Sequence, residues 1–302
     1  MLQIAYHSAY VHPVREGHRF PMAKYIGIHD ALLAKGLVEE TNFVEPKLVD
    51  RQWLYLAHQS DYVNQLLDLS LSPKMVRRIG FPLTQELIDR ELYLVDGTIQ
   101  GSLSALRQGL AFNIAGGTHH AGYDFGEGFC LLNDQAVAAS FLVQQGLAHK
   151  ILIIDLDVHQ GNGTAHIFAE STHVFTFSMH AEKNYPYVKE PSFLDVDLPD
   201  GMEDEAYLAL LEEKLTYLFA FVQPDFVFYQ AGVDVLASDK LGRLSMTADG
   251  CRRRDELVFT FCKQEGVPVQ VSMGGGYSVD IQDIVDAHVA TFATALKLYG
   301  LS

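Results

Sequence analysis

The sequence predicts an α/β protein in which a largely parallel sheet is covered by helices on both faces. Two observations support this class. Apolar runs suited to buried strands alternate with helical patterns at least five times, and no internal repeat interrupts the alternation. Several strands also run directly into glycine, histidine, aspartate or tyrosine, which is typical of the ligand-binding edge of an open sheet.

The expected elements follow this alternation along the chain. Short apolar runs rich in β-branched and aromatic residues predict strands buried on both faces. Apolar residues at helical spacing predict the helices, one of which has Asp61 as its expected N-cap. Gly97 and Gly101 leave open whether residues 87–110 form one helix or two. We expect strands at Leu2–Tyr6, Asn42–Val44, Ala111–Ala115, Ile151–Ile154, Val174–Ser178, Asp225–Tyr229 and Val267–Val271; helices at Met22–Leu33, Asp61–Leu69, Leu87–Leu110, Leu131–Gln145, Glu203–Phe221, Thr247–Gln264 and Ile281–Leu298; and irregular chain at Arg77–Thr84 and Ala181–Ser192.

Composition and charge narrow the classes of protein that fit. A hydrophobic content of 48% in 302 residues is enough for a substantial core, and no linker divides the chain, so we expect one domain over residues 1–302. The net charge of −16 argues against a nucleic-acid partner and suits cationic substrates. The basic run Arg252–Arg254 is expected to be a solvated helix face.

The cysteines and the chain start suggest a cytoplasmic protein. Cys130, Cys251 and Cys262 form no C-x-x-C pair, so neither a disulfide framework nor a thiolate zinc site is expected. The first residues lack the features of a signal peptide, and no run of about 18 apolar residues is present to span a membrane. The sequence leaves the oligomeric state open.

The stretch Ile151–Gly163, ILIIDLDVHQGNG, organises the predicted site. Asp155, Asp157 and His159 follow a buried strand at every second position, so they point to one side if the extended geometry persists. Carboxylates and an imidazole are costly to bury unless a cation or a set of donors receives them. A metal ion is the simplest recipient, while solvated acids or a helix cap are the alternative.

Two of these residues and Asp234, which follows the predicted strand Asp225–Tyr229, could form a ligand set for one divalent ion. Asp157, His159 and Asp234 would leave a further coordination position open, as catalytic zinc sites do. Mixed oxygen and nitrogen ligands do not select zinc strongly over iron(II) or manganese. Taken alone, Asp234 would equally suit a helix N-cap after a strand.

Further polar residues follow two other predicted strands. His119 and His120 come after two glycines, and both could touch a metal-bound water, one as general base and the other held charged beside it. Tyr277 follows three glycines and could donate a hydrogen bond to an oxyanion opposite the metal. Alone, the histidines would be read as an exposed turn and the tyrosine as a packing residue.

Four sequence motifs resemble those of the histone deacetylase superfamily. The runs Gly116–Asp134 (GGTHHAGYDFGEGFCLLND), Asp155–Thr164 (DLDVHQGNGT), Gln230–Asp239 (QAGVDVLASD) and Met273–Tyr277 (MGGGY) match its order and spacing. With His18-Arg19-Phe20-Pro21, the resemblance spans nearly the whole chain, and the HQGNG form looks most like class IV and bacterial relatives. It implies the arginase/deacetylase fold, a three-layer α/β/α sandwich on a mostly parallel sheet of about eight strands.

The resemblance also implies roles for individual residues in a metal-dependent deacylase. Zinc, or iron(II), would be held by Asp157, His159 and Asp234 and would polarise a water and the amide carbonyl. His120 would move the proton from the water to the leaving amine, with His119 as its electrostatic partner. Tyr277 would stabilise the oxyanion. Asp155 would orient His119 and Asn162 would orient His120.

Other positions are matched to the family's channel and ion sites. Gly128 and Phe129 resemble one wall of the substrate channel, and Tyr185 aligns with the opposite wall. A structural potassium ion is expected near Asp155 and Ser178. Arg19 matches an arginine of the family's internal product channel. The loop Gly80–Thr84 departs from the family, because it carries no acidic rim residue to hold a peptide backbone.

The expected activity is removal of an acetyl or longer acyl group from acyl-lysine in proteins or peptides. A binuclear arginase-type site is disfavoured, because Gly161 and Leu236 stand where extra carboxylates would be needed. Deacetylation of small acetylated amines, such as polyamines, is the closer rival. A catalytically silent acyl-lysine-binding module is the third reading, although the metal ligands, the histidine pair and the tyrosine are all present.

Overall fold

The computed structural model describes residues 2–301 and contains a single eight-stranded sheet within that range. The strand order is β2-β1-β3-β8-β7-β4-β5-β6, and all seven pairings are parallel. The carboxyl ends of the strands therefore share one edge, as the sequence predicts. The strands are β1 Gln3–Ala5, β2 Phe43–Val44, β3 Leu110–Asn113, β4 Ile151–Asp155, β5 Val174–Ala181, β6 Leu194–Leu198, β7 Phe226–Gln230 and β8 Val269–Ser272.

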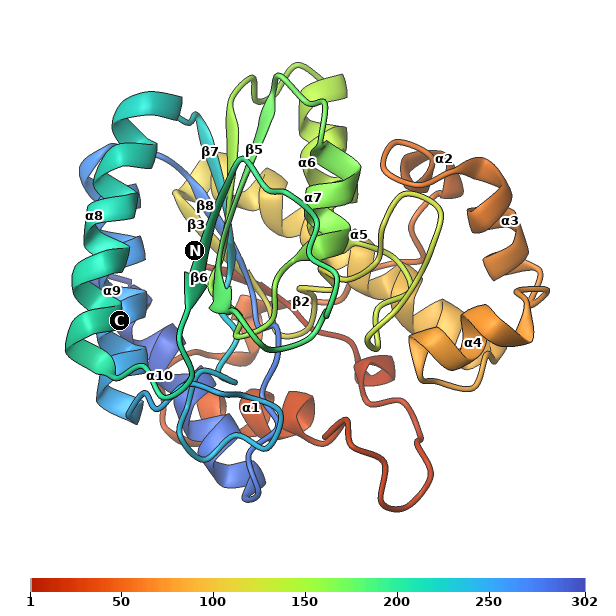
Figure 1. Ribbon diagram of the computed structural model, residues 1–302, viewed down its shortest axis with the longest axis horizontal. Coiled ribbons are helices and arrows are strands. Elements are labelled where there is room, and N and C mark those ends of the chain that lie inside the picture. Colours follow the sequence, from red (N-terminus) through yellow and green to blue (C-terminus); the bar gives the residue numbers. More distant parts are fainter. Residues whose placement is uncertain (1, 302) are drawn as a thin grey trace.

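Helices cover both faces of this sheet, which gives the three-layer α/β/α sandwich (Figure 1). The layer formed by α8, α9 and α10 lies on one side, and α5, α6 and α7 lie on the other, with α2, α3 and α4 beyond α5. The helices are α1 Lys24–Ala34, α2 Arg51–Leu54, α3 Ser60–Leu67, α4 Pro73–Ile79, α5 Gln85–Gln108, α6 Asp134–Gln144, α7 Asn162–Phe168, α8 Asp204–Val222, α9 Ala248–Gln264 and α10 Ile281–Tyr299; short 3₁₀ turns occupy Ser8–Tyr10 and Glu40–Asn42.

The sequences of the central strands reflect their burial between two layers of helices. Every residue of β3, β4, β7 and β8 is buried, so these strands read as continuous apolar runs before their polar ends. At the edge of the sheet, β6 instead has the sequence LDVDL with partly exposed positions. No strand was predicted there, although the alternation of apolar and acidic residues is a signal for one.

Residues 85–108 form one helix, α5, so its two internal glycines do not divide it. Thr84 caps the helix by accepting a hydrogen bond from the Leu87 amide, and Gly109 ends it in the left-handed conformation. Gly97 is needed for packing, because a Cβ there would lie 2.6 Å from the Tyr10 hydroxyl. The helix can therefore press closely against β1 and β3 beneath it.

Three local predictions were wrong. Residues 77–79 belong to α4 and not to a loop; Ser72 caps this helix and Pro73 occupies its first turn. Asp61 lies inside the first turn of α3, whose N-cap is Gln59. Arg254 is not solvated but fully buried, where it pairs with Asp255.

Buried Arg254 has a clear structural role. Its Nη1 donates to the carbonyl oxygens of Leu156 and Gly232 at 3.2 and 2.5 Å, just beyond the ends of β4 and β7. These are the two strands whose ends carry the candidate metal ligands. Among residues 2–301, no helix is both long enough and apolar enough to cross a membrane.

Candidate functional site

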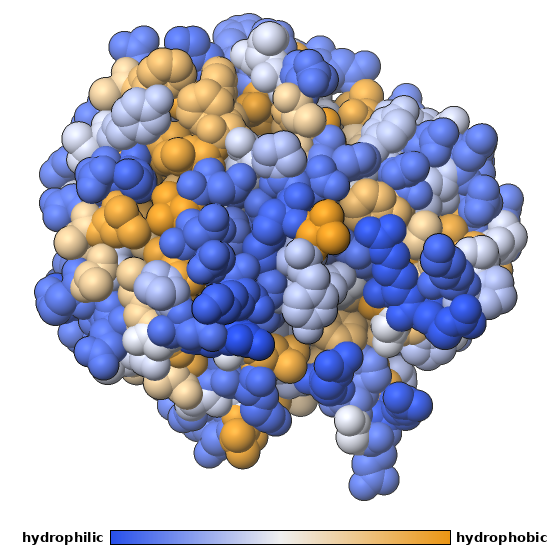
Figure 2. All heavy atoms as spheres, viewed as in Figure 1, coloured by the Kyte–Doolittle hydropathy of each residue, from blue (hydrophilic) through white to orange (hydrophobic). Residues whose placement is uncertain are grey.

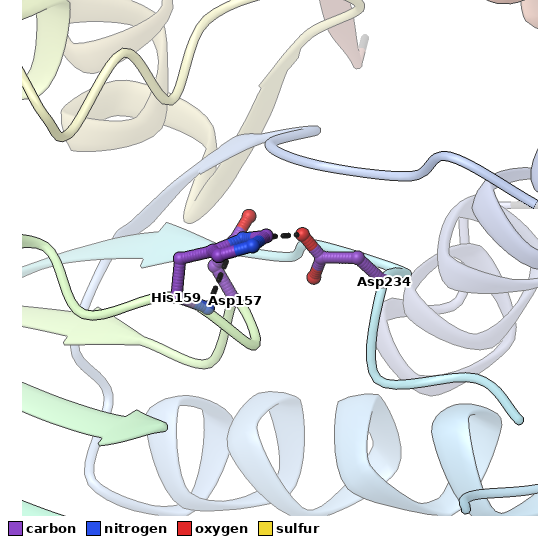
Figure 3. Close-up of side chains that lie close together, drawn as sticks. All are labelled: Asp157, His159 and Asp234. Atoms are coloured by element: carbon purple, nitrogen blue, oxygen red, sulfur yellow. Dashed lines mark hydrogen bonds and ion pairs between the residues drawn. The ribbon is translucent and has the colours of Figure 1, made fainter. Parts of the chain in front are cut away.

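Three side chains converge just past the ends of the adjacent strands β4 and β7 (Figure 3). They are Asp157, His159 and Asp234, and their candidate ligand atoms all lie within 4.8 Å of one another. The His159 Nδ1 is 3.1 Å from Asp157 Oδ1 and 3.2 Å from Asp234 Oδ2. The structure thus brings together the three residues that the sequence pattern nominated as ligands.

The chemistry of this cluster fits a divalent cation. Asp157 and Asp234 are buried side by side. The Gly275 amide donates a hydrogen bond to Asp157 Oδ2, and the Val158 amide donates one to Asp234 Oδ1. Burial first, and then the negative charge of Asp157, raise the pKa of Asp234 to about 7. A bound dication would remove this repulsion and keep both acids ionised. Two carboxylates and one imidazole suit zinc or iron(II).

The histidine pair stands directly beside the ligand cluster. The rings of His119 and His120 lie 4.1 Å apart between centroids, and both side chains are buried. Nδ1 of His119 is 2.7 Å from Asp155 Oδ2, and Nδ1 of His120 is 2.7 Å from Asn162 Oδ1. Each Nδ1 is engaged by an acceptor, so each Nε2 is left to face the cavity.

Glu127, which was not among the predicted site residues, fixes the orientation of the Asn162 amide. Nδ2 of Asn162 donates to Glu127 Oε1 at 2.5 Å, which leaves the amide oxygen facing His120. That oxygen can only accept, so His120 must carry its proton on Nδ1 and keep the lone pair on Nε2. Arg78 in turn holds Glu127 through Nε at 2.5 Å. In the sequence, Glu127 appears merely as one acid of a glycine-rich loop.

The two histidines are electrostatically different. Burial would lower the pKa of His119, but Asp155 and Asp157 outweigh it and raise that pKa to about 9. For His120, burial and the positive charges of His119 and His159 act together, so its pKa lies well below the ordinary value. At neutral pH His119 is therefore the charged partner and His120 is the neutral ring able to accept a proton.

Tyr277 faces the same cavity from the loop that follows β8. Its backbone amide donates to Asp239 Oδ2 at 2.5 Å, and buried Lys24 donates to the neighbouring Gly274 carbonyl at 2.7 Å. Burial, reinforced by the charges of Asp157 and Asp234, raises the pKa of Tyr277 well above its ordinary value. Its hydroxyl is therefore a protonated donor. Asp239 and Lys24 position the loop, and only their contacts in the folded chain reveal this.

An outer cleft of about 290 Å³ leads from the surface to His120 and His159, and its walls include Gly128, Phe129 and Tyr185. The backbone turns at Gly128 and Phe129, both with positive φ, and a Cβ at residue 128 would lie 2.6 Å from the His120 ring. Only glycine leaves room there. The three expected channel residues thus lie together around the approach to the site.

The internal arginine expected from the family is not Arg19. Arg19 is exposed and lines the outer cleft. The inner cavity, about 30 Å³ in volume and enclosed between His119, Tyr277 and Tyr25, is lined instead by buried Arg90. The motif match at His18-Arg19 was misleading, because both residues line a groove at the surface of the folded chain.

The region proposed for potassium lies behind the histidine pair. Asp155 on β4 and Ser178 on β5 are register partners in the sheet. The Ser178 hydroxyl lies 2.9 Å from His180 Nδ1, and one Asp155 oxygen accepts from the Asp157 amide. The two residues therefore lie side by side, as the sequence comparison implied.

Comparison with known proteins agrees with this architecture. Residues 18–292 match the Histone deacetylase domain family. An uncharacterized protein of Picosynechococcus sp. is 47% identical over 98% of this chain and 99% of its own length. Histone deacetylase 2 of Arabidopsis thaliana is 31% identical over 86% of this chain and 70% of that protein.

Solved structures share the fold. An HDAC homolog crystallised with SAHA superposes with a TM-score of 0.83 at 24% identity, covering 99% of this chain and 84% of that one. The HD domain of HDA15 superposes with a TM-score of 0.79 at 22% identity, covering 98% and 95%. With the buried Asp157, His159 and Asp234 cluster in place, the chain belongs to the histone deacetylase family and is a metal-dependent deacetylase.

Proposed function

We propose that this protein hydrolyses the amide of acetyl-lysine in proteins or peptides, releasing acetate and the free amine. The observation that carries the proposal is the pairing of a neutral His120 with a charged His119 next to the ligand cluster, at the inner end of a cleft open to solvent. This arrangement supplies a base, a fixed positive charge and a path for an extended side chain.

Zinc, or iron(II) in its place, would be held by Asp157, His159 and Asp234 and would make a bound water acidic and the amide carbonyl electrophilic. His120 accepts the proton of the attacking water at Nε2, because Nδ1 is committed to Asn162. It then passes this proton to the leaving nitrogen. One group thus serves as base and then as acid.

His119 and Tyr277 act on charge and not on proton transfer. His119 is held positive by Asp155. Its charge repels a proton on His120, so His120 readily gives up the proton that it has taken from the water. Tyr277 donates its hydroxyl hydrogen to the amide oxygen as negative charge develops there, a contribution on the order of 3 kcal/mol for comparable donors. A potassium ion held near Asp155 and Ser178 would stabilise the carboxylate that orients His119.

The inner cavity favours a short acyl group. Its free volume of about 30 Å³, which the histidine pair and two candidate metal ligands also line, suits a methyl group better than a long chain. Buried neighbours on several elements, including Arg90, Tyr25 and Cys130, close it off. Acetyl is therefore the proposed substrate group, and a long-chain acyl substrate would require these side chains to move.

Turnover of fluorogenic acetyl-lysine and dodecanoyl-lysine peptides, measured with and without a chelator, tests this function. We expect chelator-sensitive hydrolysis with acetyl as the better substrate. A zinc-replete protein that turns over no acyl amine would instead indicate a silent binding module. Hydrolysis of acetylpolyamines but not of acetyl-lysine peptides would favour the small-amine reading.

Two substitutions test the assigned roles. His120→Ala and Tyr277→Phe should each lower kcat by about 100-fold or more while zinc content stays near that of the wild type. His149→Ala and Tyr217→Phe are matched controls, because both residues are solvent-exposed, and they should be close to wild type. Loss of zinc from either site variant would show that the roles are wrongly assigned.

A further inference from the structure

The mouth of the cleft is cationic, although the whole chain carries a net charge of −16. Arg19, Arg77 and Arg78 line the outer cleft, and no aspartate or glutamate does so. All three arginines are exposed. Arg77 and Arg78 come from the last turn of α4, whereas Arg19 comes from the segment before α1. The cluster therefore exists only in the folded chain.

The side chains of two of these arginines have no polar partner among the described residues. Arg78 is neutralised by Glu127, and its guanidinium lies 4.1 Å from the centre of the Phe125 ring. The side chains of Arg19 and Arg77 make no hydrogen bond or ion pair with any residue between 2 and 301. Elsewhere on the protein, exposed Arg243 pairs with Asp200, and half-buried Arg253 pairs with Glu205. At the mouth, unlike at these two pairs, two guanidinium groups remain available to a ligand.

A second groove extends the cationic surface away from the mouth. It shares Arg19 and Arg77 with the outer cleft, adds Arg15, and is likewise lined by no acidic side chain. In Figure 2 the surface over α4 is strongly hydrophilic. The arginines therefore form a continuous track along which an extended chain could lie after leaving the cleft.

The location of the arginines at the solvent end of the cleft indicates which part of a bound substrate they would contact. Buried His120 and His159 lie at the inner end of the cleft, whereas Arg77 and Tyr187 lie at its solvent end. With the scissile amide at the inner end and the acetyl group in the small inner cavity, the lysine side chain must run outward. The residues flanking that lysine then emerge among the arginines.

We propose that this mouth selects acetyl-lysines flanked by acidic residues, through Arg19 and Arg77 as specificity-determining contacts. The proposal rests on the function proposed above and narrows its substrate class. Guanidinium groups bind carboxylates well and repel other cations, so basic peptide tails and polyamines are disfavoured. This reverses the sequence-based expectation that the acidic chain suits cationic substrates, because the local field at the mouth opposes the net charge.

Three acetyl-lysine peptides of equal length test the preference, with two glutamates, two serines or two arginines on each side of the lysine. An exposed ion pair changes binding by about two- to fivefold, so we expect kcat/KM for the acidic peptide to exceed that of the neutral one by roughly five- to tenfold at low salt. Screening should reduce the ratio to below about twofold at 0.5 M NaCl.

Charge-reversal variants locate the preference at the mouth. Arg77→Glu and Arg19→Glu should each bring the acidic-to-neutral ratio to about one or below. Lys74→Glu makes the same charge change on an exposed residue of α4 that lines neither groove, and it should retain the wild-type ratio. The ratio is measured within one preparation, so differences in folded fraction cancel. The milder Arg77→Ala should lower the ratio without introducing a new acid.

The outcomes separate this inference from the proposed function. Turnover of all three peptides at similar rates, or fastest turnover of the basic peptide, would overturn the inference and leave acetyl-lysine hydrolysis intact. An acidic preference that survives both charge reversals would overturn it as well. No turnover of any of the three peptides by zinc-loaded protein would instead reject the proposed function.

Discussion

Replacing Gly275 by alanine tests whether the cluster of Asp157, His159 and Asp234 is the metal site. Gly275 packs against both carboxylates, and its amide donates to Asp157 Oδ2 at 2.8 Å. A Cβ at this position would overlap Asp234 Oδ2 and lie 2.7 Å from Asp157 Oδ2, closer than the 3.0 Å that real Cβ atoms respect. In a close-packed interior, the Asp234 carboxylate would have to move by about 1 Å to restore contact.

Such a movement is large compared with what a metal site tolerates. Ligand distances vary by only about 0.2 Å, so displacement of one ligand in three should weaken zinc binding by at least about 100-fold, or roughly 2.7 kcal/mol. Competition with a chelator of known affinity measures this loss directly. The control is Gly101→Ala in α5, where the added Cβ would meet Gln270 at an ordinary 3.4 Å. Folded Gly275→Ala protein that binds zinc within threefold of wild type would refute the assignment.

Two further predictions concern stability. Burial lowers the pKa of His58 from 6.5 to about 4 and outweighs the opposite effect of the hydrogen bond between its Nδ1 and the Gly122 carbonyl. The contribution of neutral His58 to stability is therefore complete above pH 6.5 and is lost as the pH falls towards 4, because the unfolded chain takes up the proton first. Urea unfolding at pH 7 and 4.5 should show wild type losing roughly 2–3 kcal/mol more than His58→Gln, and equal losses would contradict the prediction. Arg254→Met should cost about 3–5 kcal/mol by leaving buried Asp255 without its cation, whereas Arg253→Met, at a solvent-screened pair, should leave the urea midpoint close to that of the wild type; similar losses for both variants would show that burial does not matter.

The sequence predicted those parts of the fold whose signal is local. The apolar runs of β4 and β7 are unmistakable because both of their faces are buried. Where the local signal was mixed, prediction failed: α4 contains two arginines and is only seven residues long, so its cap at Ser72 was overlooked. Arg254 stands in a run of three arginines, and no property of that run distinguishes the buried one from its half-buried neighbours.

The candidate site was largely accessible from sequence because its ligands and histidines lie directly at strand ends. The residues that orient them were harder to find. Glu127 meets Asn162 across 35 positions of chain, and its importance lies in a contact, not in a pattern. The cationic mouth was entirely hidden, since Arg19 and Arg77 come from different segments and the net charge of the chain points the other way.

The place of β8 in the sheet determines when the enzyme can become active during its synthesis. Within the described chain, β8 is the last strand made, yet it lies between β3 and β7 and joins the halves β2-β1-β3 and β7-β4-β5-β6. Gly275 and Tyr277 follow it immediately. A growing polypeptide on the ribosome therefore has two unjoined half-sheets until this strand emerges, and a prematurely terminated product would be inert instead of partly active.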